Sequence, residues 1–142
     1  MIWYHLLRMT TIFSKIIARE IPAKFVYEDD ICVAIMDKFP SVPGQVLVIP
    51  KVETDYAFDL PDGVYQHLML VTKRIAVALD TVFATERTCL AIEGFEVPHV
   101  HVKLYPMQKG SPNFKDVLSE TTEGIDAELA YQAKCITEQL SK

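Results

Sequence analysis

Residues 97–105 read VPHVHVKLY, and the alternation of apolar and polar side chains predicts a β-strand. Side chains on a strand point by turns to the two faces of its sheet. The residues expected on one face are therefore all titratable: His99, His101, Lys103 and Tyr105. If these four groups were buried, each would need a polar partner. The pattern favours a polar cleft on that face and a core on the face of Val100, Val102 and Leu104.

Two other interpretations of the same strand stay open. An ordinary solvent-exposed sheet face would carry two histidines and a lysine without any function. A metal site would use both histidines, but its third ligand would have to come from elsewhere: Glu93, Glu96 or His67. Because Lys103 would repel a cation beside the pair, we expect no metal and no cofactor.

The segments around this strand alternate between helix and strand patterns. Thr11 is expected to cap a short amphipathic helix over residues 12–20. Further strands are predicted over 24–28, 31–37, 45–50 and 88–93, with 45–50 central, and helices over 62–85 and 125–140. This order indicates an α+β fold in which helices cover an antiparallel sheet.

Composition narrows the class of protein. The 142 residues are 50% apolar and 23% charged, which predicts a single domain over 1–142 with residues 1–10 as an extension and 107–142 as a tail and helix. With a net charge of −5, the chain lacks the cluster of basic residues that a protein needs to bind duplex nucleic acid.

The apolar start, MIWYHLLRM, is too short to span a membrane. Three widely spaced cysteines, with no CxxC pair, favour free thiols and a cytoplasmic location: Cys32, Cys89 and Cys135.

Four blocks of sequence carry a family resemblance. They are IFSKIIAREIPAK at 12–24, VAIMD at 33–37, PGQVLVIPK at 43–51 and PHVHVKLYP at 98–106. In this order and spacing they resemble the Hint-like branch of the histidine-triad (HIT) superfamily. The resemblance covers residues 11–106, about two-thirds of the chain.

The resemblance implies a fold and a chemistry. The expected fold is a five-stranded antiparallel sheet with a long packing helix and a short N-terminal helix, usually in a homodimer. His101 matches the histidine that attacks the α-phosphorus of a nucleotide and becomes transiently nucleotidylated, before water releases the mononucleotide. The backbone carbonyl of His99 is expected to fix the ring tautomer of His101, and Lys103 takes the place of the third histidine.

The resemblance also implies a purine nucleotide site. Asp37 matches the acid that holds the ribose hydroxyls, although an acid that ends a strand is also a common turn residue. The short stretch before the histidines corresponds to the family segment that contacts the phosphate, and Glu96 stands where the family has a serine. The residues expected at the phosphate are Gly94, Glu96 and Val97. Five apolar side chains are expected to line the pocket for the purine base; alternatively, they are ordinary residues of the hydrophobic core. They are Ile12, Phe13, Ile16, Ile21 and Ile35.

Several positions depart from the family pattern. Gln45 and Glu53 replace further histidines, and Lys103 cannot exchange a proton near neutral pH as an imidazole does. A carboxylate at Glu96 would repel phosphate, so we expect Glu96 to pair with Lys103. The leading hypothesis is a purine nucleotide hydrolase or nucleotidyl transferase of the nucleoside phosphoramidate type. The alternatives are a mononucleotide-binding protein with little catalysis and a dinucleoside polyphosphate hydrolase.

Overall fold

A five-stranded antiparallel sheet organises the chain, as the sequence predicted. The computed structural model describes residues 10–119 and 121–142, so the expected extension before residue 10 falls outside it. The sheet has the strand order β1-β2-β3-β5-β4, with β3 in the centre. The elements are α1 (Ile12–Ile17), β1 (Phe25–Glu28), β2 (Cys32–Met36), β3 (Val46–Pro50), the 3-10 helix η2 (Ala57–Asp59), α2 (Asp62–Phe83), β4 (Arg87–Ala91), β5 (Val102–Met107), α3 (Phe114–Val117) and α4 (Asp126–Leu140).

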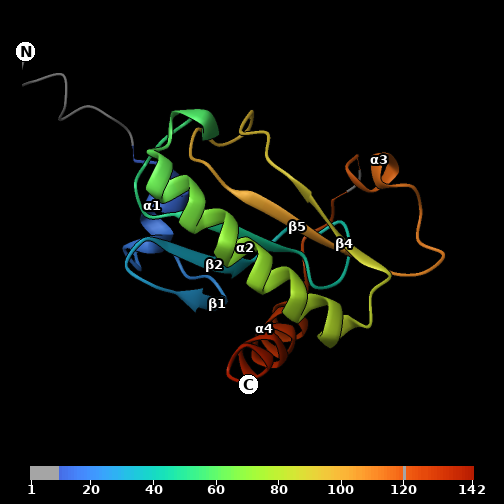
Figure 1. The fold of residues 1–142 in the computed structure, drawn as a ribbon. Helices are drawn as coiled ribbons and strands as arrows, with labels where there is room; N and C mark the ends of the chain where they lie inside the picture. The colour runs from blue at the N-terminus through green and yellow to red at the C-terminus, as the bar shows by residue number, and fades with distance from the viewer. Residues whose placement is uncertain (1–9, 120) are drawn as a thin grey trace, which may run out of the picture.

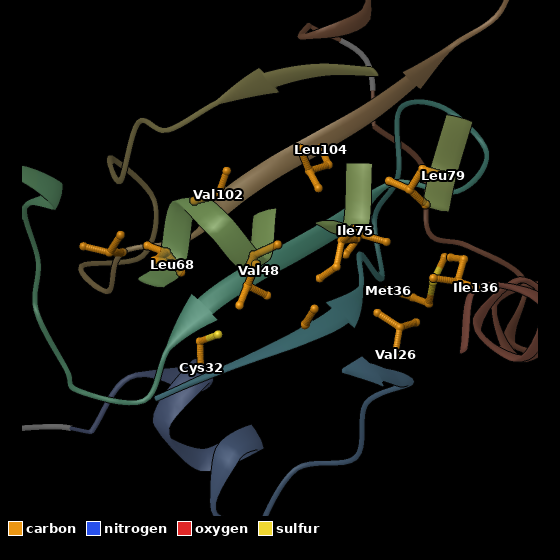
Figure 2. Packing of buried hydrophobic residues seen from close by; sticks show 14 of the residues in the cluster. Val26, Cys32, Met36, Val48, Leu68, Ile75, Leu79, Val102, Leu104 and Ile136 are labelled. Carbon is orange, nitrogen blue, oxygen red and sulfur yellow. The ribbon is translucent and has the colours of Figure 1, made fainter. Parts of the chain in front are cut away.

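The main core lies between the sheet and its two long helices. In Figure 1, α2 runs diagonally across the sheet and α4 lies beside it. The apolar positions of α2 recur at helical spacing, so one stripe of the helix faces the sheet. Figure 2 shows Ile75 of α2 pointing toward Val48 of β3, with Leu104 of β5 and Ile136 of α4 in the same cluster. Burial of these aliphatic side chains is the main stabilising term of the fold.

The opposite face of the sheet carries the histidines and is covered only in part. Along β2, Cys32 and Ala34 belong to the α2 side, whereas Val33 and Ile35 belong to a second cluster with Phe13 of α1. This is the two-residue period of a strand that is buried on both faces. A third, smaller cluster lies at the far end of this face: Tyr105, Met107 and Val117.

The short helix α1 begins as predicted but ends earlier. The Thr11 side chain accepts a hydrogen bond from the backbone N–H of Ser14, which is the expected N-cap. The helix stops at Ile17 rather than residue 20, because Arg19 has a left-handed φ of 65°. The Glu20 N–H then bonds the carbonyl of Lys15 at 2.9 Å, which closes the C-terminus.

The strand predicted over residues 97–105 is shorter than expected. β5 begins only at Val102, so His99 and His101 precede the sheet ladder. The Val100 N–H bonds the carbonyl of Thr54 instead of a strand neighbour. Two short helices, η2 and α3, were not predicted. No helix in the described ranges has the length and apolar composition that crossing a bilayer requires.

Candidate functional site

The ring of His101 is held in one tautomer by the backbone. Its Nδ1 lies 2.8 Å from the carbonyl oxygen of His99. A carbonyl oxygen only accepts hydrogen bonds, so Nδ1 carries the proton and Nε2 presents a lone pair. Nε2 has no hydrogen-bond partner within the described residues. Thr72 Oγ1 is the only fully buried side-chain polar atom there that lacks a partner, so Nε2 is not a fully buried atom of that kind. Among the described residues, therefore, no group occupies the Nε2 lone pair of His101.

The rest of the His101 ring is enclosed. The residue is only 3% exposed, and its ring centroid lies 4.8 Å from that of Phe13. Burial lowers the pKa of His101, and the nearby Lys103 charge acts in the same direction. His101 is consequently neutral at pH 7. The ring lines a small pocket whose other walls come from the segment around η2 and from the β4–β5 turn, including Ala57 and Gly94.

His99 is a buried supporting residue. It is completely buried, with Nε2 2.8 Å from the Pro50 carbonyl and Nδ1 2.8 Å from the Thr11 hydroxyl. Nε2 must donate to the carbonyl, so Nδ1 accepts from Thr11. The expected open polar face is therefore wrong at this position, because α1 and the end of β3 supply both partners. Burial lowers the pKa of His99.

Glu53 joins α1 to the segment that follows β3. Its Oε1 accepts hydrogen bonds from the Thr11 backbone N–H at 2.8 Å and from the Ser14 hydroxyl at 3.1 Å. The Thr11 N–H is the main group that holds the pKa of Glu53 below its usual range. A carboxylate thus occupies this position to anchor the helix. Sequence reasoning missed this network, whose one sequence signal was the Thr11 cap.

Lys103 lies in the middle of the histidine face, but its partner is not the predicted one. Its cross-strand neighbours are Leu47 of β3 and Ala91 of β4. Its Nζ lies 3.3 Å from Glu93 Oε1. The expected pairing with Glu96 is wrong, since Glu96 is exposed and forms no ion pair within the described part of the chain. Ala91 lies opposite Lys103 in the β4–β5 register, so Glu93, two residues further along, reaches the lysine before the chain turns at Gly94.

Asp37 is positioned by the loop that follows β2. Its Oδ2 accepts a hydrogen bond from Gln45 Nε2 at 2.7 Å, and its Oδ1 accepts one from the Phe39 N–H at 2.9 Å. Gln45 is buried and also accepts from the Ser41 N–H. Gln45 therefore orients the carboxylate. Each oxygen of Asp37 keeps a second lone pair for another donor.

Most of the apolar residues predicted for a purine pocket share one cluster, in which Phe13 packs on the His101 ring. Phe13, Ile16 and Ile35 are buried in one cluster, with half-buried members around them: Ile21 and Val97. Ile12 lies apart from this cluster and is 47% exposed. The structure thus brings four of the five predicted pocket residues together with Val97, as a packed cluster whose more accessible members form its edge. His67, named as a possible third metal ligand, contacts Asp29 on the other side of the sheet instead.

Comparison with known proteins shows the family. The model of the HIT domain matches residues 18–110. An uncharacterized HIT-like protein of Synechococcus elongatus is 39% identical over 99 residues, which is 66% of this chain and 87% of that protein. The purine nucleoside phosphoramidase of Escherichia coli is 35% identical over 106 residues, which is 66% of this chain and 84% of that enzyme. The chain belongs to the HIT family.

A solved structure is similar over almost the whole chain. The HIT-like protein of Bartonella henselae, described as involved in cell-cycle regulation, superposes with a TM-score of 0.80 at 27% identity. The match covers 92% of this chain and 96% of that one. The five-stranded fold is therefore the family fold.

Proposed function

We propose that the protein is a purine nucleotide hydrolase or nucleotidyl transferase of the nucleoside phosphoramidate type, with His101 as the nucleophile. The observation that carries the proposal is the His101 ring itself, which is neutral, held through Nδ1, and has no partner on Nε2 among the described residues. A neutral imidazole needs no base to remove a proton before it attacks. The named activity of the Escherichia coli relative is of the same kind.

The reaction has two displacements. The Nε2 lone pair of His101 attacks the α-phosphorus, the bond from phosphorus to the leaving nitrogen breaks, and that nitrogen takes up a proton as it departs as an amine. Water then attacks the same phosphorus, the bond from phosphorus to Nε2 breaks, and a mononucleotide and a proton are released. The His99 carbonyl, which accepts from Nδ1, would stabilise the positive charge that the ring acquires in the adduct.

The surrounding residues suit the parts of a nucleotide. The Lys103 ammonium is close enough to His101 to lower its pKa, and we assign it to the phosphate. Gly94, on the wall of the same pocket, would admit the phosphate close to the backbone, with Glu96 and Val97 continuing this edge. Asp37 would accept hydrogen bonds from the ribose hydroxyls. The purine would pack on the edge of the α1 cluster, beside Phe13.

Turnover of adenosine 5′-phosphoramidate tests this proposal. The protein should release AMP, and His101→Ala should abolish the release while calorimetry still detects AMP binding. Gln66→Ala, an exposed change on α2, serves as the control and should leave the rate unchanged. Absence of AMP release by the unaltered protein, or equal release by His101→Ala, would contradict the proposal.

A second candidate is a purine mononucleotide-binding protein with little turnover. The observation that favours it is the Lys103–Glu93 pair, because Glu93 offsets the charge that would stabilise the reacting phosphate. AMP binding without AMP release would support this candidate. A dinucleoside polyphosphate hydrolase would differ only in its leaving group, and a diadenosine polyphosphate in the same assay distinguishes it.

We also propose that residues 1–142 act as one domain that forms a homodimer in the cytoplasm. β4 is an edge strand of the sheet, and its Leu90 side chain is exposed. Exposed edge strands pair readily with a second chain. Light scattering should give twice the chain mass, and Leu90→Lys should reduce it.

A further inference from the structure

Three side chains of types that can ligate a metal converge on the face of the sheet opposite His101. Asp29 lies in the β1–β2 turn, Cys32 is the first residue of β2, and His67 is in the second turn of α2. One donor atom from each of the three lies within 4.8 Å of the others. Cys32 points to the α2 side of the sheet, whereas the candidate active site is on the other face.

The turn itself does not account for this convergence. Asp29 Oδ1 accepts from the N–H groups of Ile31 and Cys32 at 2.7 and 2.8 Å, which is enough to cap the turn. The other oxygen, Oδ2, lies 2.6 Å from His67 Nε2 and 3.9 Å from Cys32 Sγ, and it accepts from the Tyr27 hydroxyl at 2.7 Å. A nitrogen, a sulfur and an oxygen donor thus meet around one point.

We propose that Asp29, Cys32 and His67 bind a divalent transition-metal ion, and that zinc is the ion these donors suit best. Zinc takes thiolate, imidazole and carboxylate ligands at about 2.0 to 2.3 Å, in tetrahedral geometry. Ligand atoms around such an ion lie roughly 3.3 to 3.6 Å apart. The two distances from Oδ2, 2.6 and 3.9 Å, lie on either side of this range. The third pair, His67 Nε2 and Cys32 Sγ, lies within 4.8 Å, so binding would move the His67 ring away from Asp29 and toward Cys32.

Access and charge also fit an ion that enters from solvent. The side chains of His67 and Asp29 are 35% and 24% exposed, and the buried Cys32 thiol forms the floor. Burial tends to raise the pKa of Asp29, but hydrogen bonds from Tyr27, Cys32 and His67 hold it well below its usual range, so the carboxylate is charged. Lys51, a cation close enough to act on the pKa of Cys32, is paired with Glu28 at 3.1 Å.

Binding exchanges one proton for the metal. Burial, reinforced by Asp29, raises the pKa of Cys32 to about 12, so the free thiol is neutral. The S–H bond breaks, the proton leaves to solvent, and the sulfur lone pair binds the ion. The proton on His67 Nε2, which donates to Asp29 in the metal-free chain, is given up to solvent while Nδ1 takes one up, so that Nε2 can bind the ion. Water takes the fourth position. The bound ion would tie the β1–β2 turn to α2 and stabilise the fold without taking part in chemistry at His101.

Cobalt(II) provides the test, because a thiolate bound to cobalt gives a near-ultraviolet charge-transfer band that nitrogen and oxygen ligands do not give. The unaltered protein titrated with cobalt(II) chloride should develop this band at one ion per chain. Cys32→Ala should abolish it, and His67→Gln should weaken cobalt binding at least tenfold. Glutamine can still donate to Asp29, so the His67→Gln chain should fold even if Cys32→Ala does not.

Three control variants keep the test specific. Cys89→Ser and Cys135→Ser change the other two thiols, and His101→Asn changes the candidate nucleophile; all three should keep the band. Zinc chloride should raise the melting temperature of the unaltered protein and leave that of His67→Gln unchanged. Absence of the band from the unaltered protein, or its persistence in His67→Gln at unchanged affinity, would overturn the proposal.

Discussion

The Nδ1 atom of His101 lies 2.8 Å from the carbonyl oxygen of His99, and this contact links the buried interior to the candidate reactive atom. His99 is itself fixed by Thr11 and by the Pro50 carbonyl. The backbone that orients His101 is thus held at two points, by Thr11 at the start of α1 and by Pro50 at the end of β3. Such preorganisation is what a nucleophile needs in order to meet a phosphorus atom in line.

The pH dependence of the reaction should reflect the buried state of His101. Burial lowers its pKa below the ordinary value of 6.5, so the neutral nucleophile persists as the pH falls through 6.5. We expect the acid limb of kcat/KM for adenosine 5′-phosphoramidate to lie below pH 6.5. Initial rates between pH 4.5 and 8 measure it. A limb at or above pH 6.5 would contradict the assignment of His101 as a buried neutral nucleophile.

Thr11→Val should destabilise the protein by about 1–3 kcal/mol. The change removes the N-cap of α1 and leaves the buried Nδ1 of His99 without its donor. Urea unfolding measures the loss as a lower midpoint. Thr10→Val, at the exposed neighbouring position, is the matched control and should change stability by less than about 0.5 kcal/mol. Equal effects of the two variants would rule out the proposed role of Thr11.

Glu93→Gln should strengthen AMP binding by about fivefold at low salt, because it releases the full charge of Lys103 toward the phosphate. The gain should shrink as salt screens the charges. Calorimetry at two salt concentrations measures both effects. Glu96→Gln removes the same charge from an exposed position that has no ion pair with any described residue, and it should give the smaller gain. The reverse order would show that Glu96 is the carboxylate that opposes phosphate.

Asp37→Asn should reduce the discrimination between AMP and 2′-deoxy-AMP. The amide replaces one acceptor oxygen with a donor, so only part of the ribose diol can be bound. We expect AMP binding to weaken by about tenfold, in line with the loss of one hydrogen bond to a charged group, with much less change for the deoxynucleotide. An undiminished preference for AMP would place the ribose away from Asp37.

Local patterns predicted most of the elements. The Thr11 cap, the long helix α2 and the central strand β3 follow from spacing and side-chain type alone. The start of β5 could not be predicted in this way, because the alternation in VPHVHVKLY continues through residues that lie outside the ladder. Where the strand begins depends on Thr54, whose carbonyl takes the Val100 N–H.

The side-chain partners in the candidate site depended on tertiary structure. Glu93 and Glu96 are three residues apart, and the pairing of β4 with β5 determines that Glu93, before the turn at Gly94, reaches Lys103. His99 has one ring partner 49 residues away and another 88 residues away. Asp29 and His67 are likewise separated by 38 residues, so their contact is visible only after the chain has folded.

Adduct mapping tests the central claim most directly. The protein is mixed with adenosine 5′-phosphoramidate, quenched within the first turnover, digested and examined by mass spectrometry. We predict one adenylyl group on the peptide that carries His101, localised to that imidazole and absent from His101→Ala. An adenylyl group on another residue, or AMP release from a chain that never carries one, would contradict the account.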